Sequence, residues 1–239
     1  MTKKETGGPA GGQRNLRVAL KTARRRTASS QRWLERQLND PYVAAAKREG
    51  YRSRAAYKLK EIDDKYRFLK PGQRVVDLGA APGGWSQIAA ERVRAIEGHG
   101  QIVAIDYLGM EPLAGVDLVE MDFTEPGAED KLIGLLREGR AHVVLSDMAA
   151  PTSGHKATDH LRIMGLAEVA AAFACEVLEN GGVFLAKVFQ GGTEKDLLDI
   201  LKKSFASVRH IKPPASRSDS AELYVLATGF RGRPQAQSE

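Results

Sequence analysis

Residues 74–87 read Arg-Val-Val-Asp-Leu-Gly-Ala-Ala-Pro-Gly-Gly-Trp-Ser-Gln, and this stretch decides the fold. Residues 74–78 form a short apolar run with two β-branched valines, which is typical of a buried parallel strand. Residues 79–84 contain three glycines and a proline, a composition that excludes the interior of a strand or helix. Helix-forming residues resume at Ser86. We therefore predict a strand, a glycine-rich turn and a helix whose N-terminus presents free N–H groups to a ligand.

The spacing of this turn narrows the class of ligand. It lacks the Gly-x-x-x-x-Gly-Lys-Ser/Thr pattern of a phosphate-binding loop and the clean Gly-x-Gly-x-x-Gly of a dinucleotide site. Asp77 stands inside the apolar strand, where a carboxylate is costly unless something pairs with it. An acid followed by Gly79, Pro82 and Gly83 suits a ligand with a positive group and an amino-acid moiety, so we predict S-adenosylmethionine (SAM). The alternative is a tight turn without a ligand.

The charge of the chain is concentrated near its N-terminus. The 239 residues carry a net charge of +6, but residues 1–60 contain 16 Lys and Arg against four Asp and Glu, whereas the remainder contains 20 against 26. We predict a flexible basic extension over 1–29, one domain over 30–230 and a disordered tail over 231–239. The extension favours a nucleic-acid partner, with Arg24, Arg25 and Arg26 on backbone phosphates. A solvated tail that keeps the chain soluble is the alternative.

Several classes of protein are disfavoured by composition. No stretch reaches the length of an apolar membrane span, and the N-terminus has no apolar secretory core. The single cysteine, Cys175, excludes disulfide support, and no Cys/His cluster has the spacing of a metal site. We expect a cytoplasmic protein without a metal, and a monomer as the default state.

Strand and helix patterns alternate along the chain, which predicts an α/β fold with a mostly parallel sheet covered by helices on both faces. Before the first strand we expect a helix capped by Ser29 or Ser30 and running through Leu38, a second over 42–48 and a third from Tyr51. After it we expect strands over 101–106, 116–123, 142–147, 183–188 and 221–229, and helices over 127–138, 158–178 and 193–205.

Charged residues recur at the ends of the predicted strands, namely Asp77, Asp106, Asp122, Asp147 and Lys187. Parallel sheets bind ligands beyond the carboxyl ends of their strands, so these residues predict one shared pocket. Asp106 is placed to accept hydrogen bonds from ribose hydroxyls and Asp122 from an adenine amine. Each could instead be a capping carboxylate.

Lys187 interrupts the apolar run Phe184-Leu185-Ala186-Lys187-Val188-Phe189. Burial disfavours a charged ammonium group unless an anion pairs with it. Asp147 ends the neighbouring predicted strand and Glu222 opens the last one, so both are candidate partners. Lys187 is therefore either half of a structural salt bridge or a catalytic group.

Five segments, in order, resemble the FtsJ (RlmE or RrmJ) family of ribosomal RNA ribose 2′-O-methyltransferases, and the resemblance runs from about Ser30 to Gly229. They are Ser-Arg-Ala-Ala-Tyr-Lys-Leu (53–59), Val-Asp-Leu-Gly-Ala-Ala-Pro-Gly-Gly-Trp-Ser-Gln (76–87), Ser-Asp-Met-Ala (146–149), Lys-Val-Phe-Gln-Gly (187–191) and Glu-Leu-Tyr-Val-Leu-Ala (222–227). The resemblance implies a Rossmann-like, SAM-dependent methyltransferase fold with seven strands, the last antiparallel.

The resemblance also implies site residues and a substrate. A catalytic Lys-Asp-Lys-Glu tetrad falls on Lys58, Asp147, Lys187 and Glu222, with Lys187 as general base or cationic positioner. The family's cofactor positions fall on Gly83, Trp85, Asp106, Asp122 and Asp147. The implied substrate is a uridine in the aminoacyl-tRNA-binding loop of large-subunit (23S) rRNA, methylated on assembled or nearly assembled subunits. An extra alanine in residues 149–152 and a longer basic extension depart from the family pattern.

Further cations would bind the RNA backbone, namely Arg32, Arg52, Arg54 and Lys60. Three other functions stay open: a transfer RNA ribose 2′-O-methyltransferase, a non-catalytic rRNA-binding factor in subunit assembly, and a nucleotide-dependent dehydrogenase. The intact tetrad disfavours the non-catalytic factor, and the missing Gly-x-Gly-x-x-Gly pattern disfavours the dehydrogenase.

The basic extension generates the first testable prediction. Deletion of residues 1–28 removes phosphate contacts, so the affinity for RNA falls and the dependence of log K on log salt becomes shallower. Filter binding at several salt concentrations measures both quantities. An unchanged affinity with an unchanged salt slope would show that the extension is inert.

Overall fold

The computed structural model describes residues 27–151, 153–191 and 195–232. Arg24, Arg25, Arg26 and residues 233–239 of the tail predicted over 231–239 lie outside the described residues. The chain divides into two compact units, residues 1–44 and 45–239. The described part of the first unit contains helix α1 (Ala28–Leu38) and the start of α2 (Pro41–Glu49). Thr27, rather than Ser29 or Ser30, caps α1, because its Oγ1 accepts a hydrogen bond of 3.3 Å from the N–H of Ser30.

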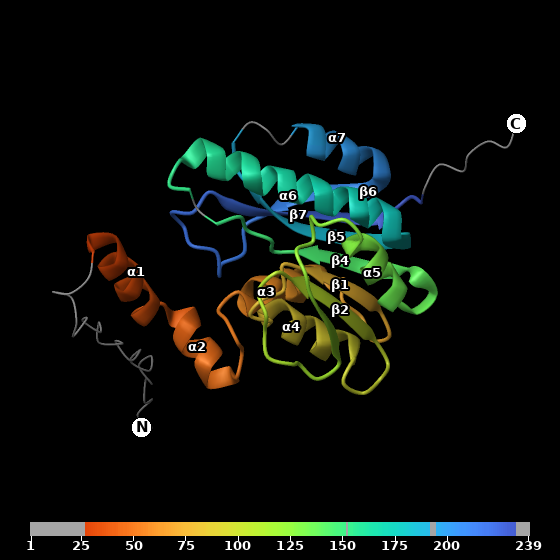
Figure 1. The fold of residues 1–239 in the computed structure, drawn as a ribbon, viewed down its shortest axis with the longest axis horizontal. Coiled ribbons are helices and arrows are strands. Elements are labelled where there is room, and N and C mark those ends of the chain that lie inside the picture. The colour runs from red at the N-terminus through yellow and green to blue at the C-terminus, as the bar shows by residue number, and fades with distance from the viewer. Residues whose placement is uncertain (1–26, 152, 192–194, 233–239) are drawn as a thin grey trace, which may run out of the picture. The chain divides into compact units, whose positions relative to one another are not determined.

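Residues 45–239 are organised around one seven-stranded sheet with the strand order β3-β2-β1-β4-β5-β7-β6 (Figure 1). Strands β1 to β5 pair in parallel, and β7 is antiparallel to both β5 and β6. The predicted fold class is confirmed. The strands are β1 (Arg74–Leu78), β2 (Gln101–Asp106), β3 (Val116–Glu120), β4 (Ala141–Ser146), β5 (Leu178–Phe189), β6 (Phe205–Ile211) and β7 (Glu222–Phe230).

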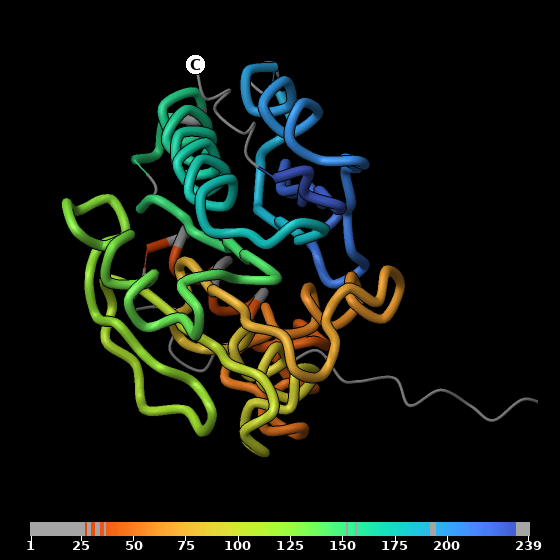
Figure 2. The backbone as a smooth tube through the Cα atoms, turned by 90° about the vertical axis from the view of Figure 1, so that its right-hand side faces the viewer, coloured from red at the N-terminus to blue at the C-terminus, as the bar shows by residue number. Residues whose placement is uncertain are grey.

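Helices cover both faces of the sheet (Figures 1 and 2). On one face, α3 (Ala56–Tyr66) and α4 (Gly84–Val93) bury a cluster that includes Leu59, Ile88 and Leu145. On the other, α5 (Ala128–Leu135), α6 (Lys156–Val177) and α7 (Lys195–Ser204) bury a second cluster. Because side chains alternate along a strand, the two clusters divide β5 between them, and Lys187 lies on the same face as Leu185, toward α3 and α4.

The structure differs from the expected elements in several bounds. Helix α3 starts at Ala56 rather than at Tyr51, and α5 ends at Leu135 rather than at residue 138. Strand β5 starts at Leu178 and contains Gly181 and Gly182, which were expected to form a helix stop before a later strand. Strand β6 follows α7 directly and was not predicted from the pattern, because charged and polar residues interrupt its alternation. Strand β3 ends at Glu120, so Asp122 lies two residues beyond it.

The parallel strands bring their carboxyl ends to one edge of the sheet, which we call the carboxyl rim. The turn after β1, Asp106 at the end of β2, Asp147 directly after β4 and Lys187 near the end of β5 all lie there. Within the described ranges, no helix combines the length and the apolar character that crossing a membrane requires.

Candidate active site

The glycine-rich turn lies in close contact with the residues that follow β4. Gly79 has a φ of +76°, and a Cβ at this position would lie 2.7 Å from Cγ and 2.8 Å from Cα of Met148. Gly83, with a φ of +107°, is the N-cap of α4. Glycine is required at both positions because the backbone is left-handed, and at Gly79 also because no side chain fits. The turn therefore presents bare backbone beside Asp147.

Asp77, predicted to face the ligand, lies beneath the turn. Its carboxylate is fully buried, and Oδ2 accepts a hydrogen bond of 2.6 Å from Oγ of Ser86 in α4. Burial raises the pKa of Asp77 to about 7, against the opposing effect of the Ser86 hydroxyl. Asp77 does not line the pockets of the rim described below. Ser86 is therefore the partner of Oδ2, while the buried Oδ1 has no hydrogen-bond partner among the described residues.

A pocket of about 320 Å³ opens on the carboxyl rim, with Asp106, Asp122 and Asp147 as its acidic residues. The carboxylate of Asp106 joins two segments, because Oδ2 accepts from the N–H of Ala81 at 2.9 Å and Oδ1 from that of Leu108 at 2.8 Å. Oδ1 of Asp122 accepts from both the N–H and the hydroxyl of Thr124, which lowers the pKa of Asp122. The rest of the lining is largely apolar and includes Ile105, Tyr107, Phe123, Met148, Pro151 and Leu166.

A second, smaller cavity of about 20 Å³ shares Gly79, Ala81 and Asp147 with the larger pocket and extends to Ser53, Pro82 and Trp85. The Trp85 indole is fixed by a hydrogen bond of 2.9 Å from Nε1 to the carbonyl of Ala55. The hydroxyl of Ser53 is buried and has no hydrogen-bond partner among the described residues. A buried hydroxyl without a partner is costly, so this cavity suits one polar group the size of a water molecule beside the larger pocket.

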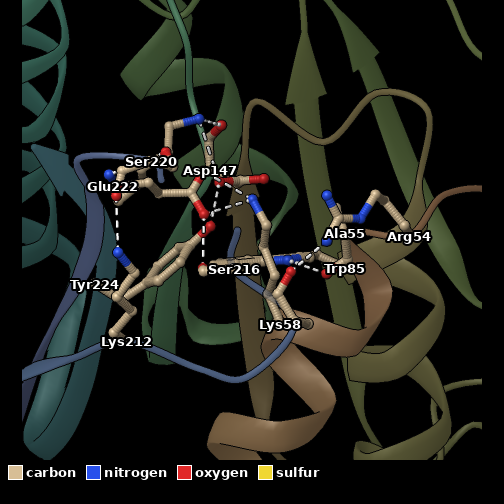
Figure 3. A network of polar contacts seen from close by, with 12 residues as sticks. Arg54, Ala55, Lys58, Trp85, Asp147, Lys212, Ser216, Ser220, Glu222 and Tyr224 are labelled. Carbon is tan, nitrogen blue, oxygen red and sulfur yellow. Dashed lines mark hydrogen bonds and ion pairs between the residues drawn. The ribbon is translucent and has the colours of Figure 1, made fainter. Parts of the chain in front are cut away.

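The four residues of the predicted tetrad come together as two ion pairs beside these cavities. Nζ of Lys58, from α3, lies 2.8 Å from Oε1 of Glu222, from β7 (Figure 3). Nζ of Lys187 donates to the main-chain carbonyl of Asp147 at 2.7 Å and lies 3.3 Å from its Oδ1. The Lys187 side chain is only 7% exposed, and its ammonium group is held by Asp147.

Tyr224 connects the two pairs, and sequence reasoning assigned it no role. Its hydroxyl donates a hydrogen bond of 3.0 Å to Oδ1 of Asp147, its ring lies 5.6 Å from Nζ of Lys58, and it pairs with Lys187 in the sheet register. The signal was present in the sequence, because residues two apart in a strand share a face, which places Tyr224 beside Glu222. Ser216 was also missed; its Oγ donates to Oε1 of Glu222 at 2.8 Å.

The charges around this cluster keep the carboxylate of Asp147 ionised and the hydroxyl of Tyr224 neutral. Burial raises the pKa of Asp147, but the ammonium groups of Lys187 and Lys58 and the Tyr224 hydroxyl outweigh it and hold that pKa below its usual value. Burial and the negative charges of Asp147 and Glu222 raise the pKa of Tyr224, which remains a neutral donor. The cluster thus presents an amine, fixed by a carboxylate, next to the ligand-sized pocket.

The cations predicted to bind RNA have protein partners. The Arg52 guanidinium donates to main-chain carbonyls, Nη2 of Arg54 donates to the carbonyl of Ala215, and Nζ of Lys60 lies 3.7 Å from Oε2 of Glu49. Arg32 belongs to α1, but its side chain is outside the described residues. In the part of the chain that the structure describes, no group of three or more His, Cys, Asp or Glu side chains could hold a metal ion.

The raised pKa of Asp77 makes the stability of the protein depend on pH. Between pH 3.8, the usual pKa of an aspartate, and about 7, the native state binds more protons than the unfolded state. The stability that Asp77 contributes is therefore full below this window and is lost as pH rises through it. In the wild type the free energy of unfolding falls by up to about 1.4 kcal/mol per pH unit over this window, and Asp77→Asn removes this fall. Urea unfolding of the wild type and the variant at pH 5 and pH 7 measures this difference. If the free energy of unfolding changed equally with pH in the two proteins, the raised pKa of Asp77 would be contradicted.

Comparison with known proteins places this geometry in a family. The model of the FtsJ-like methyltransferases matches residues 51–230. The chain is 63% identical over 236 residues to the Ribosomal RNA large subunit methyltransferase E of Parvibaculum lavamentivorans, covering 96% of this chain and 92% of that protein. It is 64% identical over 217 residues to the protein of that name in Rhodopseudomonas palustris, covering 91% and 92%.

A solved structure also resembles this chain in fold. The crystal structure described as a ribosomal RNA methyltransferase from Plasmodium falciparum superposes with a TM-score of 0.67 at 32% identity, covering 77% of this chain and 100% of that chain. The matched family segment contains both the glycine-rich turn and the tetrad. The chain belongs to the FtsJ-like methyltransferase family, as its five segments predicted.

Proposed function

We propose that the cofactor is SAM and that it occupies the pocket of the carboxyl rim. The fit rests on the glycine-rich turn, whose Gly79 lines both cavities, on the unpartnered Ser53 hydroxyl in the small cavity, and on the three acids of the large pocket. Asp106 and Asp122 would bind the nucleoside, while the turn up to Gly83, with Pro82 and Trp85, would enclose the amino-acid end. When bound, SAM supplies a methyl group activated by a positively charged sulfur.

We infer that the acceptor is the 2′-hydroxyl of a ribose. Lys187 would contact the acceptor oxygen and take up or guide its proton, because Nζ is the amine that the tetrad directs toward the rim. Asp147 orients that amine through its carbonyl and its carboxylate, and Tyr224 fixes the carboxylate. Lys58 and Glu222 form the outer wall of the acceptor site. Much of the rate acceleration would come from this alignment.

We propose large-subunit (23S) rRNA as the substrate, and within it a uridine of the aminoacyl-tRNA-binding loop in assembled or nearly assembled subunits. The names of the relatives support the RNA class, and the excess of Lys and Arg in residues 1–60 supports a polyanionic partner. A monomer acting in the cytoplasm is consistent with such a substrate. The observation that carries the proposal is the pairing of Lys187 with Asp147 beside the pocket.

Methyl transfer from labelled SAM tests the substrate. Undermethylated large subunits, free rRNA and total transfer RNA are incubated separately with the protein, and label is expected in the rRNA of the subunits, at the ribose of one uridine. Label in transfer RNA alone would contradict the proposal and favour a transfer RNA methyltransferase. Binding to subunits with no transfer to any of the three would favour a non-catalytic assembly factor.

Lys187→Ala separates catalysis from cofactor binding. The variant loses the group at the acceptor oxygen, so turnover falls by about 10²–10⁴-fold, while the Kd for SAM changes little. Single-turnover kinetics and calorimetric titration measure the two effects, and Lys202→Ala, an exposed lysine of α7, serves as the control. A loss of SAM affinity in Lys187→Ala as large as its loss of rate would contradict the assigned role.

Asp147→Ala is expected to damage both turnover and SAM binding, because this residue lines the pocket and holds Lys187.

A further inference from the structure

The segment from Gly50 to Ala55, directly before α3, lies between the glycine-rich turn and the tetrad. Its main chain is fixed to α4, because the N–H of Arg52 donates to Oε1 of Gln87 at 2.8 Å and Nε2 of Gln87 donates to the carbonyl of Gly50 at 3.0 Å. The segment carries two arginines, separated by Ser53. Their side chains are directed to different loops, one on the cofactor side and one on the acceptor side.

Arg52 joins the turn to the loop between β2 and β3, residues 107–115. Its Nη1 donates to the carbonyl of Glu111 at 2.7 Å and to that of Pro82 at 3.3 Å, and Nη2 donates to the carbonyl of Pro112 at 2.8 Å. The guanidinium also packs on the turn itself, since a Cβ at Gly83 would lie 3.0 Å from Nη1.

The loop that Arg52 holds forms part of the large pocket. Tyr107 and Leu108, its first two residues, line the pocket beside Asp106. Both side chains are more than half exposed, with 52% and 54% of their surface accessible, so packing against the core does little to hold this wall. The three carbonyl contacts of Arg52 therefore connect the loop that carries this wall to the glycine-rich turn.

Arg54 holds the loop that precedes β7, residues 212–221 (Figure 3). Its Nη2 donates to the carbonyl of Ala215, and the N–H of Ala215 donates to Oε2 of Glu61 at 2.7 Å. The next residue, Ser216, donates to Glu222, which pairs with Lys58. Arg54 thus acts on the tetrad through the main chain of this loop.

We propose that the two arginines position the two halves of the site: Arg52 holds the wall of the cofactor pocket, and Arg54 holds the loop that orients Glu222. The inference rests on the proposed function in taking SAM as the cofactor and the tetrad as the catalytic group. It replaces the expectation that both side chains are phosphate contacts, because their guanidinium groups are engaged by carbonyls of the protein. A planar fork with several donors can join two carbonyls at once, whereas a lysine ammonium of equal charge cannot reproduce that geometry.

Charge-preserving variants distinguish positioning from phosphate binding. We expect Arg52→Lys to raise the Kd for SAM about tenfold with a smaller change in kcat at saturating SAM. Arg54→Lys is expected to lower kcat about tenfold with the Kd for SAM unchanged. Arg137→Lys, at an exposed arginine that precedes β4 at the opposite end of the sheet, is the matched control and should behave as wild type.

Hydrogen exchange supplies a readout that needs no cofactor. In the free protein, amides of residues 107–115 should exchange faster in Arg52→Lys, and amides of residues 212–221 faster in Arg54→Lys, each without effect on the other loop. Uniformly faster exchange over the sheet would reveal a general loss of stability and would overturn the proposal.

The opposite result is equally clear. If both lysine variants keep the SAM affinity, kcat and loop exchange of wild type, while Arg52→Ala and Arg54→Ala weaken RNA binding and flatten its salt dependence, the arginines are phosphate contacts and the proposal is wrong. A wild-type protein that fails to bind SAM would instead contradict the proposed function, and hydrogen exchange would still decide the roles of the two arginines.

Discussion

The site depends on one interaction, the pairing of Lys187 with Asp147 at the ends of two neighbouring parallel strands. An ammonium group that is 7% exposed is stable in an apolar strand only if its charge is met nearby, and Asp147 meets it with both its carbonyl and its carboxylate. The parallel pairing of β4 and β5 fixes the distance between the two residues. The same pairing keeps the pKa of Asp147 low, so the carboxylate that holds the amine stays charged.

Asp147 also belongs to the cofactor side, because it lines both cavities of the rim. The turn approaches it so closely that no side chain is possible at Gly79. As a consequence, Asp147 lies between the pocket and the amine of Lys187. This geometry suits a reaction in which the protein mainly aligns an acceptor and manages one proton.

Much of this arrangement could be predicted from the sequence, because the chemistry of parallel sheets places polar residues at strand ends. Asp106, Asp147 and Lys187 were found in that way, and the extent of β1 was predicted correctly. The limits of β5 could not be predicted, because its two glycines resemble a helix stop, whereas in the structure they lie between Leu178 and Val183, where the register with β4 shifts. Strand β6 lacks a clear alternation and is defined by its pairing with β7.

The directions of side chains were harder to predict from the sequence than the positions of the strands. Asp77 looked like a ligand-facing acid, but only the position of α4 shows that Ser86 is its partner. Arg52 and Arg54 looked like free cations, since nothing in their neighbourhood in sequence reveals that carbonyls 30 to 161 residues away accept their hydrogen bonds. Contacts between residues so distant in the chain are not encoded in local pattern. They appear only when the fold is assembled.

A crystal structure of the protein with SAM and a short RNA tests the central claim most directly. Our account predicts that the cofactor lies over Gly79 between Asp106 and Asp147, and that the acceptor 2′-oxygen contacts Nζ of Lys187 while facing the methyl group. A cofactor bound elsewhere, or a Lys187 side chain turned away from the ribose, would contradict it.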